Sequence, residues 1–289
     1  LVGTVATSAV TRDELTRMMI GRDLQPVEAK PRLASNVPVV QVRDATLQDS
    51  RSVRLLDGLS LELNAGEVLG LAGVAGNGQR ELIEAMAGIR RIDSGDILLD
   101  GRSIRECTSR AIARLGVGHV PEDRFKDGLV PDFSIAENII LGQHWDAAWR
   151  RGPLLDGERM ARHANASIAE FSIVATGPDA PIRKLSGGNA QKVILARELA
   201  KATRCLLCNQ PTRGLDVGVI DYVHKEILRK RDEGVAVLLA SEELEDLLAL
   251  SDRIAVMFRG RIMGVVSRGS ADVARLGRMM AGASAEDAA

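Results

Sequence analysis

The sequence lacks most of the features that mark secreted, membrane-spanning or nucleic-acid-binding proteins. Its three cysteines are too few and too unevenly spaced for a disulfide framework, so we expect a reducing compartment. No apolar run reaches the roughly 18 residues that a transmembrane helix needs, and we expect no signal peptide. The net charge of −1 gives no support for nucleic-acid binding, and the four scattered histidines predict no metal cluster.

Two of the cysteines, Cys205 and Cys208, form a C-x-x-C pair, a spacing that holds a metal or performs redox chemistry in some proteins. The pair lies inside an apolar run, and the chain has no second pair. We therefore interpret this stretch as a buried strand rather than as a metal or redox site.

The sequence does contain a regular alternation of short apolar runs and helical stretches. Apolar runs such as 235–240 have no polar alternation, which is typical of parallel strands covered on both faces. The expected strands are 38–42, 59–63, 67–72, 96–99, 117–120, 204–208, 235–240, 252–258 and 261–266. The expected helices include 79–88, 108–115, 158–171, 187–200, 219–233, 242–249 and 270–281. Because 121–185 is mostly helical and loop-like, we predict an α/β domain with a helical subdomain.

The two ends of the chain resemble each other. Residues 1–23 align without a gap on a segment near the end, at a constant offset of 261 residues, as from Gly3 to Gly264. A repeat at this distance indicates a duplicated domain rather than a solenoid, although a chance match of two amphipathic helices is the alternative. The predicted parts are the tail of a preceding copy at 1–23, a linker at 24–36, a second copy at 37–282 and a tail at 283–289.

A glycine-rich stretch, GVAGNGQR, follows one expected strand and precedes an expected helix. A phosphate-binding loop of the pattern G-x-x-x-x-G-K-[ST] is expected at such a place. Gly73 and Gly78 have the glycine spacing of this pattern. The lysine, however, is replaced by Gln79 and the hydroxyl residue by Arg80, so the charge chemistry of the loop is missing.

The most informative string is LSGGNAQK, which begins at Leu185. Its Ser-Gly-Gly opens a predicted helix, whose free N–H groups and positive dipole end favour a phosphate, and Ser186 adds a hydroxyl donor. Alone, the string could be an ordinary capped helix. The sequence PTRGLD at 211–216 follows closely and makes the pattern much more specific.

These strings resemble the ATP-binding cassette (ABC) ATPases. LSGGNAQK is similar to the signature motif of that family, and CLLCNQPTRGLDVG is similar to its Walker B strand and D-loop. The resemblance covers about residues 37–268. It implies an ABC-type P-loop ATPase cassette with a RecA-like α/β core, an antiparallel β subdomain and a helical subdomain at about 121–200. The strings NGQRELIEA and QPTRGLDVG most resemble the second cassette of tandem ATPases from bacterial sugar and nucleoside importers, with the nucleoside branch favoured.

The resemblance also implies roles for individual positions. The nucleotide-binding positions are Gly73, Gly76, Gly78, Gln79, Arg80, Glu122 and Asn209. The catalytic positions are Gln210, where the family has the Walker B glutamate, and Glu242, where it has the switch histidine. The signature motif is Leu185, Ser186, Gly187, Gly188 and Gln191, and the D-loop is Leu215 and Asp216.

Several of these positions depart from the family pattern. Gln79 carries no charge to offset a triphosphate, and Arg80 cannot ligate a cation, although it could pair with phosphate in the absence of Mg²⁺. Gln210 cannot accept a proton from attacking water, a role that accounts for about 10²–10⁴ in rate. We therefore expect this half to bind ATP with little or no Mg²⁺ and to hydrolyse it poorly or not at all. Its intact signature motif would instead complete the Mg²⁺–ATP site of a partner cassette.

The predicted function is that of an ATP-binding, energy-coupling subunit of a bacterial ABC importer for nucleosides or sugars. The implied partners are the preceding cassette of the same chain, transmembrane permease subunits and, indirectly, an extracytoplasmic solute-binding protein, but no nucleic acid. The implied location is the cytoplasmic face of the inner membrane, where the protein would be peripheral. The alternatives are a non-catalytic nucleotide-binding regulatory or dimerisation module and a soluble ABC ATPase not linked to transport. The last is disfavoured because no coiled-coil arm or basic tract interrupts the cassette.

Three other features have two interpretations each. Trp145 and Trp149 have helical spacing and either pack within the subdomain or face a partner. The charged stretch at 122–127 is either a solvated face or a contact for the permease. Arg213 either stabilises its own domain or bonds across a dimer.

Overall fold

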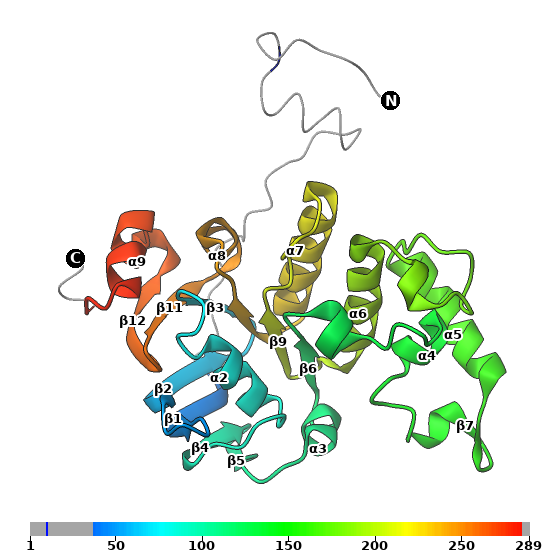
Figure 1. Cartoon of the computed structure of the whole chain (residues 1–289), viewed down its shortest axis with the longest axis horizontal. Helices are drawn as coiled ribbons and strands as arrows, with labels where there is room; N and C mark the ends of the chain where they lie inside the picture. The colour runs from blue at the N-terminus through cyan, green and yellow to red at the C-terminus, as the bar shows by residue number, and fades with distance from the viewer. Residues whose placement is uncertain (1–9, 11–36, 285–289) are drawn as a thin grey trace.

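The computed structural model describes residue 10 and residues 37–284 (Figure 1). The predicted tail of a preceding copy at 1–23, apart from residue 10, and the predicted linker at 24–36 lie outside the described residues. So does the end of the chain from residue 285. The described part contains two sheets of at least four strands, with helices between and around them, and a helical subdomain at one side.

The core of the fold is a six-stranded sheet with the strand order β12-β11-β3-β10-β9-β6. The strands are β3 (Val68–Ala72), β6 (Val117–Val120), β9 (Cys205–Asn209), β10 (Ala236–Ala240), β11 (Arg253–Phe258) and β12 (Arg261–Ser267). All neighbours pair in parallel except β12, which is antiparallel to β11. Every residue of β3, β9 and β10 is buried, which is why these strands are continuous apolar runs.

The predicted antiparallel β subdomain is a four-stranded sheet with the order β2-β1-β4-β5. Its strands are β1 (Pro38–Gln48), β2 (Arg54–Asn64), β4 (Ser94–Leu99) and β5 (Arg102–Ser103). In β2 the buried residues alternate with exposed ones over Leu59, Leu61 and Leu63, as expected of a sheet with one face on the core. Helix α2 (Gln79–Met86) contacts both sheets and buries Leu82 and Ile83 in the same apolar core as the leucines of β2.

Other helices surround the six-stranded sheet. They are α3 (Ser109–Arg114), α6 (Gly187–Lys201), α7 (Val217–Asp232), α8 (Leu244–Leu250) and α9 (Val273–Met280). Helices α6, α7, α8 and α9 contribute to one large apolar core, and Figure 1 shows them on one side of the sheet, opposite α2. No helix of residues 37–284 is both long enough and apolar enough to span a bilayer.

The helical subdomain contains the two predicted kinds of structure, helices and loops, and also a short two-stranded ladder that the sequence did not predict. Its helices are α4 (Ile135–Ile139) and α5 (Gly157–Glu170), with short turns of helix at 124–128, 147–149 and 182–184. Helix α4 has only five residues and begins with a capping box between Ser134 and Glu137. Strands β7 (Arg150–Arg151) and β8 (Leu154–Leu155) form an exposed two-stranded ladder, so the expectation of helices and loops alone was incomplete here.

A buried charge cluster joins the helical subdomain to α6. Arg197 donates to the backbone carbonyls of Gly128 at 2.7 Å and of Asn138 at 3.3 Å, and its Nε donates to Glu198 at 2.6 Å. Burial alone would raise the pKa of Glu198, but the charges of Arg197 and Lys201 lower it to about 2. The carboxylate therefore stays charged, and α6 is fixed to the subdomain through groups whose hydrogen bonds are satisfied.

The C-x-x-C stretch is a buried strand, as predicted. Cys205 and Cys208 lie in β9 and are both buried. Burial raises the pKa of Cys205 to about 12 and raises that of Cys208 as well, so both remain protonated thiols. Among the described residues, no group of three or more His, Cys, Asp or Glu side chains could hold a metal ion.

Candidate nucleotide site

The glycine-rich loop connects β3 to α2 and depends on glycine geometry. Gly76 and Gly78 have positive φ angles of 84° and 107°. At Gly78 a Cβ atom would also lie 2.4 Å from the carbonyl oxygen of Leu55 and 2.6 Å from Cε of Met257. Gly78 is therefore required both for its backbone conformation and for the close packing beneath it.

The side chain of Gln79 folds back over this loop. Its Nε2 donates to the carbonyl oxygen of Val74 at 3.2 Å, and Nδ2 of Asn77 donates to the same oxygen at 2.9 Å. A Cβ at Gly73 would lie 2.3 Å from Nε2 of Gln79. The side chains that hydrogen-bond within the loop are thus neutral amides. The first-turn N–H groups of α2 have no intrahelical acceptor, so they are suited to bind an anion.

Most of the predicted nucleotide and catalytic positions converge on one cavity of about 150 Å³. The predicted positions that line it are Gly73, Gly76, Gln79, Arg80, Glu122, Asn209, Gln210 and Glu242. Gly78 does not line it, because it is buried beneath the loop. In the described part of the chain, no signature or D-loop residue lines this cavity. Its charged lining is one cation, Arg80, against the three carboxylates of Glu81, Glu122 and Glu242.

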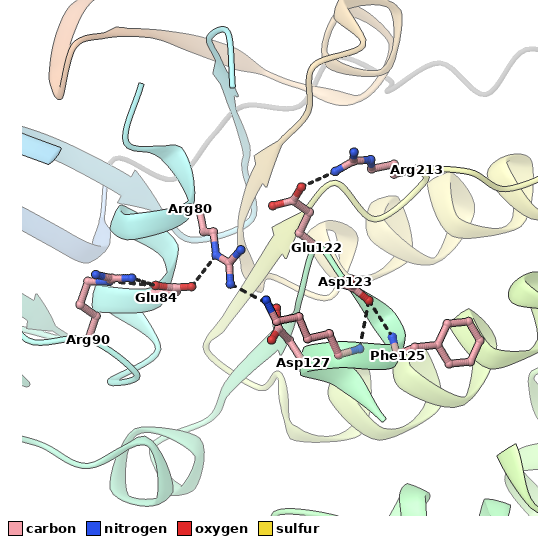
Figure 2. Close-up of polar contacts among 9 residues, drawn as sticks. Arg80, Glu84, Arg90, Glu122, Asp123, Phe125, Asp127 and Arg213 are labelled. Atoms are coloured by element: carbon pink, nitrogen blue, oxygen red, sulfur yellow. Dashed lines mark hydrogen bonds and ion pairs between the residues drawn. The ribbon is translucent and has the colours of Figure 1, made fainter. Parts of the chain in front are cut away.

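Arg80 is held by carboxylates on two sides (Figure 2). Its Nε donates to Glu84 at 2.6 Å, and its Nη2 lies 3.2 Å from Oδ2 of Asp127. The hydrogen bond to Glu84 raises the pKa of Arg80 further. Burial alone would raise the pKa of Glu84, but hydrogen bonds from Arg80 and Arg90 lower it. Arg80 and Glu84 are therefore both charged at neutral pH.

The residues around the loop do not fit a Mg²⁺ ion. Mg²⁺ requires oxygen ligands in near-octahedral geometry, and in phosphate loops a serine or threonine hydroxyl supplies one of them. Here that position carries the guanidinium of Arg80, and the end of β9 carries the amide of Asn209. Neither group supplies the anionic or hydroxyl oxygen ligand expected at its position, so no chemical step at this site is assigned to a metal.

The two predicted catalytic positions contact each other, and an amide stands at the position of the family's catalytic glutamate. Gln210 has a φ of 50°, in a region that residues other than glycine seldom adopt, and its N–H donates to the carbonyl oxygen of Ala240 at 2.9 Å. Its Oε1 accepts a hydrogen bond from the N–H of Glu242 at 3.2 Å. The amides of Asn209 and Gln210 cannot take a proton from water at neutral pH.

The predicted signature motif forms the beginning of α6. Ser186 caps this helix, since its Oγ accepts from the N–H of Asn189 at 3.4 Å. A Cβ at Gly188 would lie 2.8 Å from Cγ2 of Val219, so glycine permits the close approach of α6 to α7. Nε2 of Gln191 is buried and donates to the carbonyl oxygen of Pro211 at 2.9 Å.

The predicted D-loop lies directly beside the signature motif. Asp216 caps α7 by accepting from the N–H of Val219 at 3.1 Å. Leu185 and Leu215 are partly buried and pack against the same apolar core. The signature motif and the D-loop therefore form one packed unit, with Ser186 and Asp216 exposed at its surface.

The charged stretch at 122–127 is tied to its own domain by several side chains. Oδ1 of Asp123 accepts from the N–H groups of Phe125 and Lys126 at 3.0 Å each. Glu122 forms an ion pair with Arg213. Arg213 thus bonds within its own chain. The sequence left two interpretations of Arg213 open, and motif spacing did not indicate its contact with Glu122.

The two tryptophans also contact their own chain. The Trp145 ring lies 4.5 Å from the guanidinium carbon of Arg110 and 4.1 Å from that of Arg114. The Trp149 ring centroid lies 4.9 Å from that of His163. Trp145 also lines a cleft of about 290 Å³ between α3 and the helical subdomain, which the sequence did not predict.

Comparison with known proteins identifies the family. The family model described as "ABC transporter" matches residues 56–213, more than half of the chain. The chain belongs to the ABC transporter family.

Its similarity to curated proteins extends beyond that region. The chain is 43% identical over 277 residues to the guanosine import ATP-binding protein NupO of Bacillus subtilis (strain 168), which covers 96% of this chain and 54% of that protein. It is 41% identical over 281 residues to the nucleoside import ATP-binding protein NupA of Lactococcus lactis subsp. cremoris, covering 97% and 56%. It is also 39% identical over 283 residues to the glucose import ATP-binding protein TsgD13 of Haloferax volcanii, covering 97% and 52%. The chain spans about half the length of these curated relatives.

Solved structures confirm the predicted fold. A nucleotide-free ATP-binding cassette from an ABC transporter matches with a TM-score of 0.66 and 20% identity, over 80% of this chain and 92% of that chain. The ADP conformation of MJ1267, an ATP-binding cassette, matches with a TM-score of 0.68 and 18% identity, over 86% and 96%. The chain therefore has the ABC cassette fold.

Proposed function

We propose that this chain is an energy-coupling half of a nucleoside importer, and that its own phosphate cavity is catalytically silent. The observation that carries the proposal is a contrast between two parts of the domain. The cavity has amides at Asn209 and Gln210 and a cation at Arg80, which suit neither Mg²⁺ nor the activation of water. The packed unit of signature motif and D-loop, by contrast, has every predicted residue of both motifs, with Ser186 and Asp216 exposed at its surface.

The exposed unit would act on ATP that another cassette holds. Ser186 and the first-turn N–H groups of α6 are hydrogen-bond donors at a positive helix end, which stabilises negative charge on a γ-phosphate. The partner cassette would supply Mg²⁺ binding and the catalytic carboxylate. We propose that this partner is the preceding copy whose tail is residues 1–23.

The proposed substrate class and location follow from the relatives. NupO and NupA are named for guanosine and nucleoside import, and TsgD13 is named for glucose import, so nucleosides are favoured over sugars. The permease would bind at the cleft lined by Ile89, Arg110 and Trp145. We propose that the chain lies at the cytoplasmic face of the inner membrane, with a solute-binding protein acting through the permease.

One observation favours a second function, that of a dimerisation module without nucleotide of its own. The cavity is lined by three carboxylates and one cation, which is an unfavourable environment for a triphosphate. The two functions differ in whether ATP binds to this chain, a quantity that calorimetry measures.

Nucleoside uptake tests the proposed transport function. Cells that lack the gene are expected to lose saturable uptake of radiolabelled guanosine and to keep uptake of ribose, because the permease loses its energy-coupling subunit. Reintroducing the gene should restore guanosine uptake. Loss of ribose uptake with guanosine uptake intact would assign the chain to sugars, and no change in either would contradict a role in the import of guanosine or ribose.

A further inference from the structure

Residues 122–127, which we call the bridging segment, join the phosphate loop of this chain to its signature motif. Only Pro121 separates the segment from β6, and Asp123 holds its shape by accepting from the N–H groups of Phe125 and Lys126. Glu122 at its start contacts Arg213 and Asp127 at its end contacts Arg80 (Figure 2), while Arg124 in its middle contacts Gly187.

At its end, the bridging segment contacts the helix of the phosphate loop. Asp127 lies 3.2 Å from Nη2 of Arg80, the second residue of α2. Arg80 is fixed from the other side by Glu84, one turn along the same helix, at 2.6 Å. The guanidinium therefore joins α2 directly to the bridging segment.

At its start and middle, the segment contacts the signature motif and the residues before the D-loop. Nη1 of Arg124 donates to the carbonyl oxygen of Gly187 at 3.3 Å, and its Nη2 donates to the carbonyl oxygen of Arg213. The side chain of Arg213 in turn pairs with Glu122. A movement of the segment would therefore move the signature loop with it.

We propose that Arg80 is a positioning residue that takes the place of a metal ion, linking α2 to the bridging segment so that the signature loop is held in place without Mg²⁺ or nucleotide. The residues that do not fit Mg²⁺ then have a structural role, because the fixed guanidinium of Arg80 replaces a metal ion that could dissociate. The inference rests on the proposed function in one respect, namely that the signature loop is the part of this chain that acts on ATP elsewhere. The Arg80–Asp127 contact itself does not depend on that function.

Hydrogen–deuterium exchange on this chain tests the proposal. Arg80→Ala is expected to raise amide exchange by about two- to fivefold in peptides covering 122–128 and also in those covering 186–190, since an exposed ion pair contributes modestly. Asp127→Asn should have the same effect, and the double variant should add little to either single one. Arg80→Lys, which keeps the charge, should restore most of the protection.

The matched control is Arg90→Ala. Arg90 also pairs with Glu84, at 2.8 Å, from the side away from Asp127 (Figure 2). Its loss should leave exchange at 122–128 and 186–190 unchanged. Equal effects of the Arg80 and Arg90 substitutions would show general loosening of α2 and would overturn the proposal.

Two further outcomes would overturn it. One is an Arg80→Ala variant whose exchange changes in 122–128 but not in 186–190. The other is wild-type protein in which Mg²⁺–ATP lowers exchange in the bridging segment, because the segment would then depend on nucleotide for its order. If the exchange results hold but signature-motif variants leave ATP turnover intact, the proposed function fails while the linkage through Arg80 stands.

Discussion

Replacing Ser186 with alanine, in a protein that joins this chain to the proposed preceding cassette, is expected to lower ATP turnover by about a hundredfold. Removing one preorganised donor to developing negative charge typically costs about 10²–10³ in rate. Ser186 is exposed at the start of α6, outside its own cavity, so the loss would arise at ATP held by the partner. Phosphate release at saturating ATP measures it.

Ser134→Ala is the matched control. Ser134 caps α4 by accepting from the N–H of Glu137 at 3.2 Å, as Ser186 caps α6 by accepting from that of Asn189 at 3.4 Å. Loss of either cap is expected to lower the free energy of unfolding by about 1 kcal/mol. Only Ser186 is placed to reach a phosphate, so equal turnover in the two variants would contradict its proposed role.

Restoring the phosphate-loop chemistry is expected to produce a large gain in nucleotide binding. In this chain, Gln79→Lys combined with Arg80→Thr should tighten Mg²⁺–ATP binding by roughly ten- to a hundredfold, because a hydrogen bond to a charged group contributes about 1.5–3 kcal/mol. The lysine supplies the charge that Gln79 lacks, and the threonine supplies a hydroxyl for Mg²⁺. Calorimetry in Mg²⁺ and in EDTA should show that the new affinity requires the metal.

The control for this gain in affinity introduces side chains of similar size that have no charge and no hydroxyl group. Gln79→Met with Arg80→Val matches lysine and threonine in size but offers neither a charge nor a hydroxyl. It should show no gain in affinity. If both double variants tightened binding equally, removal of Arg80 alone would be the cause, and the explanation from missing loop chemistry would be wrong.

The strands of the core were predictable from sequence because burial on both faces leaves a clear pattern. The strand expected at 117–120 is β6 without a change of boundary, and the expected strand at 204–208 is β9 shifted by one residue. Strands β7 and β8 were missed because they have two residues each and an exposed face, as Leu154 and Leu155 illustrate. A strand of two residues is too short to show an alternation of apolar and polar side chains.

The candidate site was predictable only as far as motif spacing reaches. Spacing along the chain located Gln79 and Gln210, which line one cavity. It could not locate the contact of Arg80 with Asp127, 47 residues away, or that of Arg213 with Glu122, 91 residues away. Both contacts require the bridging segment to be packed between α2 and α6, and that packing depends on tertiary structure rather than on local sequence.

ATP turnover by this chain alone, measured over a wide range of protein concentration, tests the central claim most directly. The account predicts no steady phosphate release at any concentration, because two copies would only place a signature motif against a cavity with Gln210 at the Walker B glutamate position and Glu242 at the switch histidine position. Turnover should begin when the proposed partner cassette is added. Steady Mg²⁺-dependent turnover that rises with the concentration of this chain alone, and that Gln210→Ala abolishes, would contradict a silent site.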